Sequence, residues 1–128
     1  MDRHEAKKRE SALNAQFQQL ERQSRQIESQ KTRNAQQTKR ISQAEKVFTD
    51  TQLKKRNQLE ALSHNWKGKR AEAILSESLS NHEDFYRQQM RQIHERQQKL
   101  TQEKRTLLQQ EEKLTQAKRQ LVRGGGGR

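Results

Sequence analysis

The sequence predicts an all-α chain that folds as a long antiparallel two-helix hairpin, a coiled coil with its turn at Trp66-Lys67-Gly68. Three observations predict this fold: the composition, the placement of glycine, and apolar residues that recur every seven positions. Of the 128 residues, 34% are charged and 27% hydrophobic, with no proline and no cysteine. Such a chain is too polar for a thick globular core but is rich in helix formers. The periodicity favours helix over disorder, the other state that this polarity allows.

Glycine sets the expected boundaries. Gly68 stands alone in the middle of the chain, and the other four glycines follow one another from Gly124 to Gly127. We expect one hairpin domain over residues 1–123 and a flexible Gly-rich tail over 124–128. Within the hairpin, we expect a first helix over about 3–64, a turn over 65–69 and a second helix over about 70–122.

The first helix carries one stripe of mainly apolar residues, a first ladder with a seven-residue step. Its eight members are Leu13, Leu20, Ile27, Asn34, Ile41, Phe48, Lys55 and Leu62. The residues four positions further on are only partly apolar, because they include Ser24, Lys31, Glu45 and Gln52. The spacing is typical of a coiled coil, but the predicted seam is thin.

The second helix carries a cleaner ladder with the same step. Its members are Leu79, Tyr86, Ile93, Leu100, Leu107, Leu114 and Leu121. A turn at residues 66–68 pairs the two ladders, for example Leu13 with Leu121 and Phe48 with Tyr86. The predicted hairpin seam consists of the apolar and aromatic members of both ladders.

Two polar residues interrupt the first ladder. Asn34 and Lys55 fall opposite Leu100 and Leu79 in the predicted pairing. A buried polar residue at a seam position fixes register, because misaligned assemblies leave it unpaired. A two-helix seam open to water would tolerate both residues without such a role. Both interpretations stay open from the sequence.

Larger apolar residues outside the ladders gather near the turn. They are Val47, Leu53, Ile74, Leu75, Phe85 and Met90. Two helices that share one incomplete stripe are marginally stable alone, so a further helix is expected to cover the seam. We therefore predict that these six residues form a docking surface for a protein partner. Scattered exposed apolar residues without a role are the alternative.

The charge pattern bears on partners and location. The formal net charge is +12, but acidic residues are interleaved with the basic ones along both halves, and aromatic residues make up only 4%. This pattern disfavours nucleic acid as the main partner. We expect no membrane insertion and no cleavable signal peptide, because no apolar run approaches the length of a bilayer span.

Enzymatic chemistry has no support in the sequence. The histidines are His4, His64, His82 and His94, and none lies three or four residues from another, as a helical metal pair would require. We expect no catalytic residue, no cofactor and no metal site, and we predict that the protein is not an enzyme.

The tripeptide Trp66-Lys67-Gly68 lies between the two predicted helices. This Trp-x-Gly element resembles the turn of the WXG superfamily of helical hairpins, and most closely that of the small accessory partners of LXG-domain toxins of Gram-positive type VII secretion. The resemblance implies that Trp66 wedges between the helix ends and that Gly68 permits the tight reversal. It also implies an adaptor or targeting chaperone that binds the helical LXG domain, with a second small WXG-like protein as a further partner. The implied location is the bacterial cytoplasm, and the resemblance also allows export of the protein together with its partner.

Two features depart from that family. The arms are longer than in a typical member, and the aromatic-x-x-x-acidic export signal is missing after the second helix, where Tyr86 is followed four residues later by Met90. Phe17 and Glu21 have this spacing, but they lie on the first helix. We therefore expect a partner to supply or complete the export signal.

Two other functions fit a charged helical hairpin. One is a coiled-coil stalk or chaperone associated with a flagellar or type III export ATPase. The other is a basic coiled coil that binds nucleic acid. Homo-oligomerisation is a further open possibility.

Overall fold

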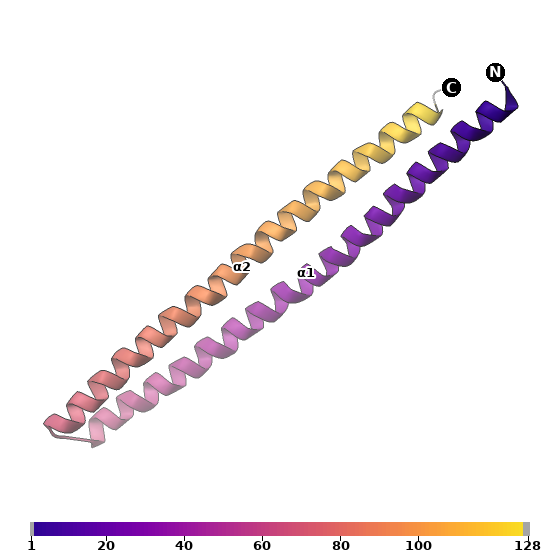
Figure 1. Cartoon of the computed structure of the whole chain (residues 1–128). Helices are drawn as coiled ribbons and strands as arrows, with labels where there is room; N and C mark the ends of the chain where they lie inside the picture. The colour runs from indigo at the N-terminus through magenta and orange to yellow at the C-terminus, as the bar shows by residue number, and fades with distance from the viewer. Residues whose placement is uncertain (1, 127–128) are drawn as a thin grey trace. The chain divides into compact units, whose positions relative to one another are not determined.

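The computed structural model describes residues 2–126 of the chain. Two helices account for nearly all of them: α1 spans Arg3–Asn65, with 63 residues, and α2 spans Lys69–Gly126, with 58 residues. Residues 66–68 join them, and no strand occurs in the described part of the chain (Figure 1). The helices pack against each other, so the predicted all-α hairpin with its turn at Trp66-Lys67-Gly68 is confirmed.

The first helix begins with a side-chain cap. The backbone N–H of His4 donates to Oδ1 of Asp2 at 3.5 Å, and the N–H of Ala6 donates to the Asp2 carbonyl at 3.2 Å. Asp2 therefore accepts hydrogen bonds from two N–H groups of the first turn. Its negative charge also interacts favourably with the positive N-terminal end of the helix dipole.

The turn depends on the backbone of one glycine. Gly68 has a φ of +119°, a region that residues with a Cβ rarely adopt. The N–H of Trp66 donates to the Leu62 carbonyl and closes α1, while the Gly68 carbonyl accepts from the N–H of Glu72, both at 2.9 Å. Gly68 thus ends the reversal and provides the first hydrogen bond of α2.

The second helix is longer than predicted. We expected it to end near residue 122 and to be followed by a flexible tail over 124–128, but α2 continues through Gly126. Glycine can adopt helical dihedral angles, although it costs about 1 kcal/mol relative to alanine in a helix. Residues 127 and 128 lie outside the described residues.

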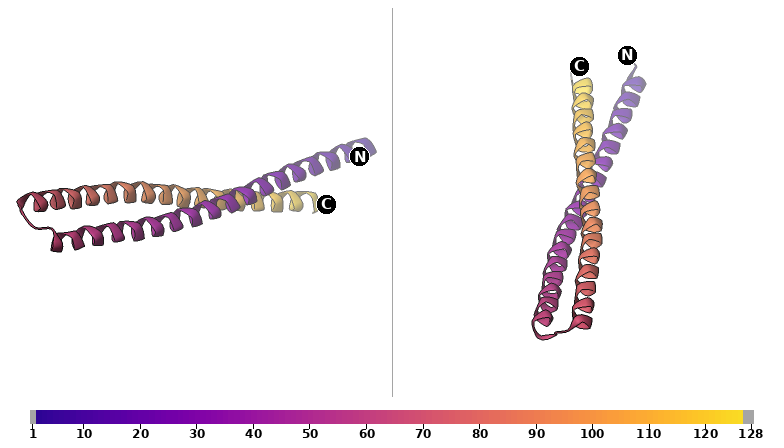
Figure 2. Two further views of the ribbon diagram at one scale, coloured as in Figure 1. Left: turned by 90° about the horizontal axis from the view of Figure 1, so that it is seen from below. Right: turned by 90° about the vertical axis from the view of Figure 1, so that its left-hand side faces the viewer.

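The chain divides into two units. The turn unit comprises residues 37–100, and the terminal unit comprises residues 2–36 and 101–126. Ala71, Leu75 and Leu100 are buried in the turn unit, whereas Ile27 and Leu107 are buried in the terminal unit. Both views of Figure 2 show α1 and α2 side by side in the turn unit.

Two contacts define the register of the turn unit. The ring of Phe48 stacks on that of Tyr86, and Nε2 of Gln97 donates to Oε2 of Glu45 at 2.7 Å. The first contact joins two ladder residues that the sequence pairs. The second joins residues that each lie four positions beyond the paired ladder residues Ile41 and Ile93.

The first ladder leaves the seam towards the turn. Lys55 is exposed and Leu62 keeps 49% of its surface in solvent, while Gln52 is buried and Leu59 is half-buried. An α-helix drifts by about 20° per heptad relative to a strict seven-residue repeat, so residues four positions along replace the ladder members. Lys55 and Leu62 are thus not in the seam.

The two polar ladder residues differ in environment. Asn34 in the terminal unit is buried, whereas Lys55 in the turn unit is exposed. Lys55 lies outside the seam, so neither interpretation applies to it, and the burial of Asn34 excludes an open, solvated seam position there.

Candidate partner-binding surface

Exposed apolar side chains gather on the turn unit. Within the described residues, six large apolar side chains of this unit are exposed: Val47, Leu53, Leu62, Trp66, Ile74 and Phe85. Four of them, Val47, Leu53, Ile74 and Phe85, belong to the docking set that the sequence predicts. Met90, which also belongs to the predicted docking set, is half-buried. The turn unit therefore presents apolar surface that the hairpin itself does not cover.

Leu75 does not belong to this surface. Only 6% of its surface is exposed, and Ala71, one helical turn earlier, is equally buried. Residues four apart lie on the same side of a helix, so Ala71, Leu75 and Leu79 form one stripe facing α1. Leu75 packs inside the hairpin, and the docking prediction was wrong at this residue.

Trp66 lies at the end of the turn unit. It keeps 45% of its surface exposed, so the structure does not bury it as a wedge between the helix ends. Its backbone N–H is satisfied by the Leu62 carbonyl. The indole therefore remains partly exposed at the turn.

An aromatic cluster supports the exposed face of α2. The Phe48 ring contacts the Tyr86 ring at a centroid distance of 5.8 Å and the Phe85 ring at 6.0 Å. Phe48 and Tyr86 are half-buried, while Phe85 is 46% exposed. Phe48 thus contacts one part of the Phe85 ring, while the rest of that ring remains exposed to solvent.

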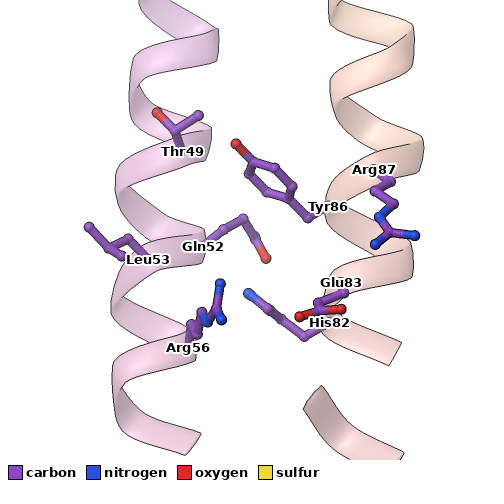
Figure 3. Close-up of a pocket in the computed structure, with 8 residues that line it drawn as sticks. All are labelled: Thr49, Gln52, Leu53, Arg56, His82, Glu83, Tyr86 and Arg87. Atoms are coloured by element: carbon purple, nitrogen blue, oxygen red, sulfur yellow. The ribbon is translucent and has the colours of Figure 1, made fainter. Parts of the chain in front are cut away.

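A groove of about 460 Å³ lies in the same unit. Thr49, Gln52, Leu53 and Arg56 line it from α1, and His82, Glu83, Tyr86 and Arg87 line it from α2 (Figure 3). The side chain of Gln52 extends from α1 towards α2 between Tyr86 and His82. Gln52 is only 5% exposed, and its Oε1 has no hydrogen-bond partner. The groove therefore combines a polar floor with charged edges.

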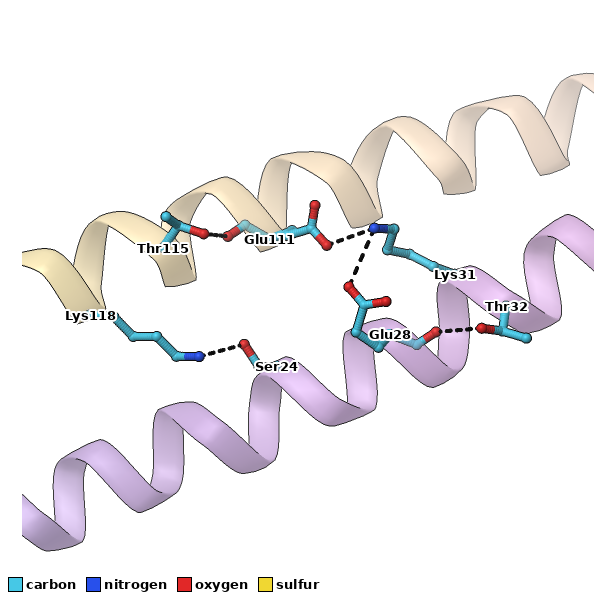
Figure 4. A network of polar contacts seen from close by, with 7 residues as sticks. All are labelled: Ser24, Glu28, Lys31, Thr32, Glu111, Thr115 and Lys118. Carbon is cyan, nitrogen blue, oxygen red and sulfur yellow. Dashed lines mark hydrogen bonds and ion pairs between the residues drawn. The ribbon is translucent and has the colours of Figure 1, made fainter.

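The terminal unit has a polar seam. Nζ of Lys31 donates to Oε2 of Glu111 at 2.7 Å and to Oε1 of Glu28 at 3.4 Å (Figure 4). The Glu111 hydrogen bond raises the pKa of Lys31, and the Lys31 hydrogen bond lowers the pKa of Glu111. Nζ of Lys118 donates to Oγ of Ser24 at 2.9 Å and pairs with Glu21 at 3.0 Å. Specific polar contacts thus flank the buried apolar residues Ile27 and Leu107 here.

These polar contacts follow a pattern that apolar counting misses. Lys31 and Glu111, and likewise Ser24 and Lys118, each lie four positions beyond a ladder residue of their helix. Glu45 and Gln97 in the turn unit share this relationship. The signal was present in the sequence as polar residues at a seam position, but only the structure pairs them.

The histidines form no metal cluster. Nε2 of His94 lies 4.0 Å from Oε2 of Glu45, and His82 is half-buried at the groove. Within residues 2–126, no three His, Asp or Glu residues are placed to hold a metal ion. In the same range, neither helix is long and apolar enough to cross a membrane.

The chain matches no known family model, no curated protein and no solved structure. The surface is therefore characterised by its own residues. Within the turn unit, its features are the exposed apolar side chains, the aromatic cluster around Phe48 and the groove with a buried polar floor.

Proposed function

We propose that this protein is a non-enzymatic adaptor, a targeting chaperone that packs its turn unit against the helical LXG domain of a secreted toxin. In this role it forms the complex in the bacterial cytoplasm and promotes type VII export, alone or with a second small WXG-like protein. The observation that carries the proposal is the group of exposed apolar residues on the turn unit, above all Phe85 held by Phe48.

Physical chemistry favours a helical partner. Complete burial of one large apolar side chain contributes about 1.5–3 kcal/mol, so a few of these residues suffice to hold a third helix. Helices with an apolar face bind such surfaces by packing side chains three and four residues apart into the grooves of a neighbour. The partner would complete a helical bundle that the hairpin alone leaves open.

The resemblance of Trp66-Lys67-Gly68 to the WXG turn supports the choice of partner class. Trp66 is exposed at the turn, and Gly68 makes the reversal. The helical LXG domain is the partner that this resemblance implies.

Co-expression with a tagged LXG helical domain encoded beside the gene tests the proposal. Phe85→Glu places a charge on the exposed face and should abolish co-purification. Leu108→Glu is the matched control, because Leu108 is similarly exposed but lies in the terminal unit. Circular dichroism on both variants verifies that the helices persist.

Further variants extend the test. Trp66→Ala, or a charge at Tyr86 or Ile93, should weaken the complex, whereas substitution of Gly124 should not. Since Tyr86 and Ile93 are half-buried, their variants count only if helicity is retained. Undiminished co-purification of folded Phe85→Glu and Trp66→Ala would overturn the proposal.

A further inference from the structure

The floor of the turn-unit groove contains an unpaired hydrogen-bond acceptor. Oε1 of Gln52 is buried and accepts no hydrogen bond, although the residue is 95% covered by the hairpin. Figure 3 shows this amide between Tyr86 and His82, with its oxygen directed away from α1. A buried acceptor without a donor destabilises the folded chain relative to an apolar residue of the same shape. A leucine or methionine at position 52 would be more stable in the isolated hairpin.

We propose that Gln52 is the specificity-determining residue of a docking groove that takes an acidic amphipathic helix carrying an asparagine or glutamine. The partner amide donates its N–H to Oε1 of Gln52, while leucine-like residues beside it contact Leu53 and Tyr86. This inference rests on the proposed adaptor function and specifies the chemistry of the partner helix.

Charge selects the partner. Arg56 and Arg87 line the groove against a single carboxylate, Glu83, and the whole chain carries a formal net charge of +12. An acidic helix is attracted to such a surface, whereas a second copy of this chain is repelled. The donor itself is a neutral amide, because a lysine or arginine at that point would lie beside Arg56 and Arg87.

Arg56 lines the groove beside Gln52. Its Nε pairs with Oε1 of Glu60 at 3.3 Å, and both side chains are more than half exposed. Exposed ion pairs of this kind are weak, so a carboxylate of the partner helix can compete with Glu60 for Arg56. This contact anchors the acidic flank of the helix, while its amide faces the Gln52 oxygen.

Fluorescence anisotropy with three labelled amphipathic peptides tests the groove without any toxin. The first has leucine at its core positions, glutamate on its flanks and a central asparagine. The second replaces the asparagine by leucine, and the third replaces the glutamates by lysines. We expect the first peptide to bind the full chain about tenfold more tightly than the second, which corresponds to one well-made hydrogen bond in a buried site. The third should not bind.

Gln52→Met removes the acceptor but keeps a long side chain, and Gln58→Met is its control because Gln58 is exposed on the same helix. We expect Gln52→Met to unfold at a higher urea concentration and to lose the preference for the asparagine peptide, while Gln58→Met retains it. Equal binding of the first two peptides by the natural chain, a preference that survives Gln52→Met, or binding of the lysine peptide would each overturn the inference. Co-purification of the toxin domain by a chain without the peptide preference refutes the groove and leaves the adaptor role standing.

Discussion

The rings of Phe48 and Tyr86 stack between α1 and α2 with their centroids 5.8 Å apart and their planes inclined by 13°. Phe85, the neighbour of Tyr86, contacts the same Phe48 ring at an interplanar angle of 59°. One aromatic side chain of α1 thus organises two consecutive residues of α2, one in the seam and one at the surface. The contact links the stability of the turn unit to the surface that it presents.

Phe48→Ala should destabilise the chain by about 2–3 kcal/mol, because it removes a half-buried ring together with two aromatic contacts. Urea unfolding followed by circular dichroism measures the change. Val47→Ala is the control, since Val47 is exposed and should change stability by less than about 0.5 kcal/mol. Equal effects of the two substitutions would show that the aromatic cluster does not support the hairpin.

Glycine at the turn differs from glycine at the end of α2. Gly68→Ala should cost about 1–2 kcal/mol, because a Cβ strains the backbone at a φ of +119° even though it meets no atom within 4 Å. Gly124→Ala also meets open space, but it lies in a helix and should be neutral or stabilising by up to about 1 kcal/mol. Thermal unfolding of both variants measures whether the two changes in stability differ in sign. A loss of stability in both variants would contradict the prediction.

The ion pair between Lys31 and Glu111 makes stability depend on pH. The pKa of Lys31 is raised above 10.5, so its contribution is present below that value and is lost as pH rises through the folded pKa. The pKa of Glu111 is lowered below 4.5, so its contribution is present above that value and is lost as pH falls through the folded pKa. Urea unfolding should therefore show the largest deficit of Lys31→Gln near neutral pH, and a smaller one at about pH 3. A deficit that does not change with pH would exclude the pair as its cause.

Asn34 tests whether a buried polar residue fixes the assembly. Asn34→Leu replaces an almost fully buried amide by an apolar side chain of similar size. If the amide specifies register, the variant should populate additional oligomers, as coiled coils do when a polar core residue is removed. Size-exclusion chromatography with light scattering measures this, with Asn57→Leu on the exposed face as control. A single unchanged species for Asn34→Leu would show that register is set elsewhere.

The sequence predicted the second helix better than the first. Every member of its ladder from Leu79 to Leu121 is buried or half-buried, because apolar residues occupy all seven positions. The first ladder contains polar residues, so the spacing of its apolar residues does not fully define which side of α1 faces α2. Near the turn, Gln52 and Leu59 therefore take the places expected for Lys55 and Leu62.

The candidate surface was only partly predictable. Exposure of Val47, Leu53, Ile74 and Phe85 follows from their positions outside the ladders. The burial of Leu75 depends on how the seam drifts near the turn, which a strict seven-residue repeat cannot express. The unpaired oxygen of Gln52 depends on side-chain geometry and has no sequence signal beyond a polar residue at a seam position.

Hydrogen–deuterium exchange of the chain with and without the helical LXG domain tests the adaptor proposal most directly. The proposal predicts that the partner increases protection of backbone amides around Val47 to Arg56 and Ile74 to Met90 more than anywhere in the terminal unit. Absence of a complex, or protection confined to residues 2–36 and 101–126, would contradict it.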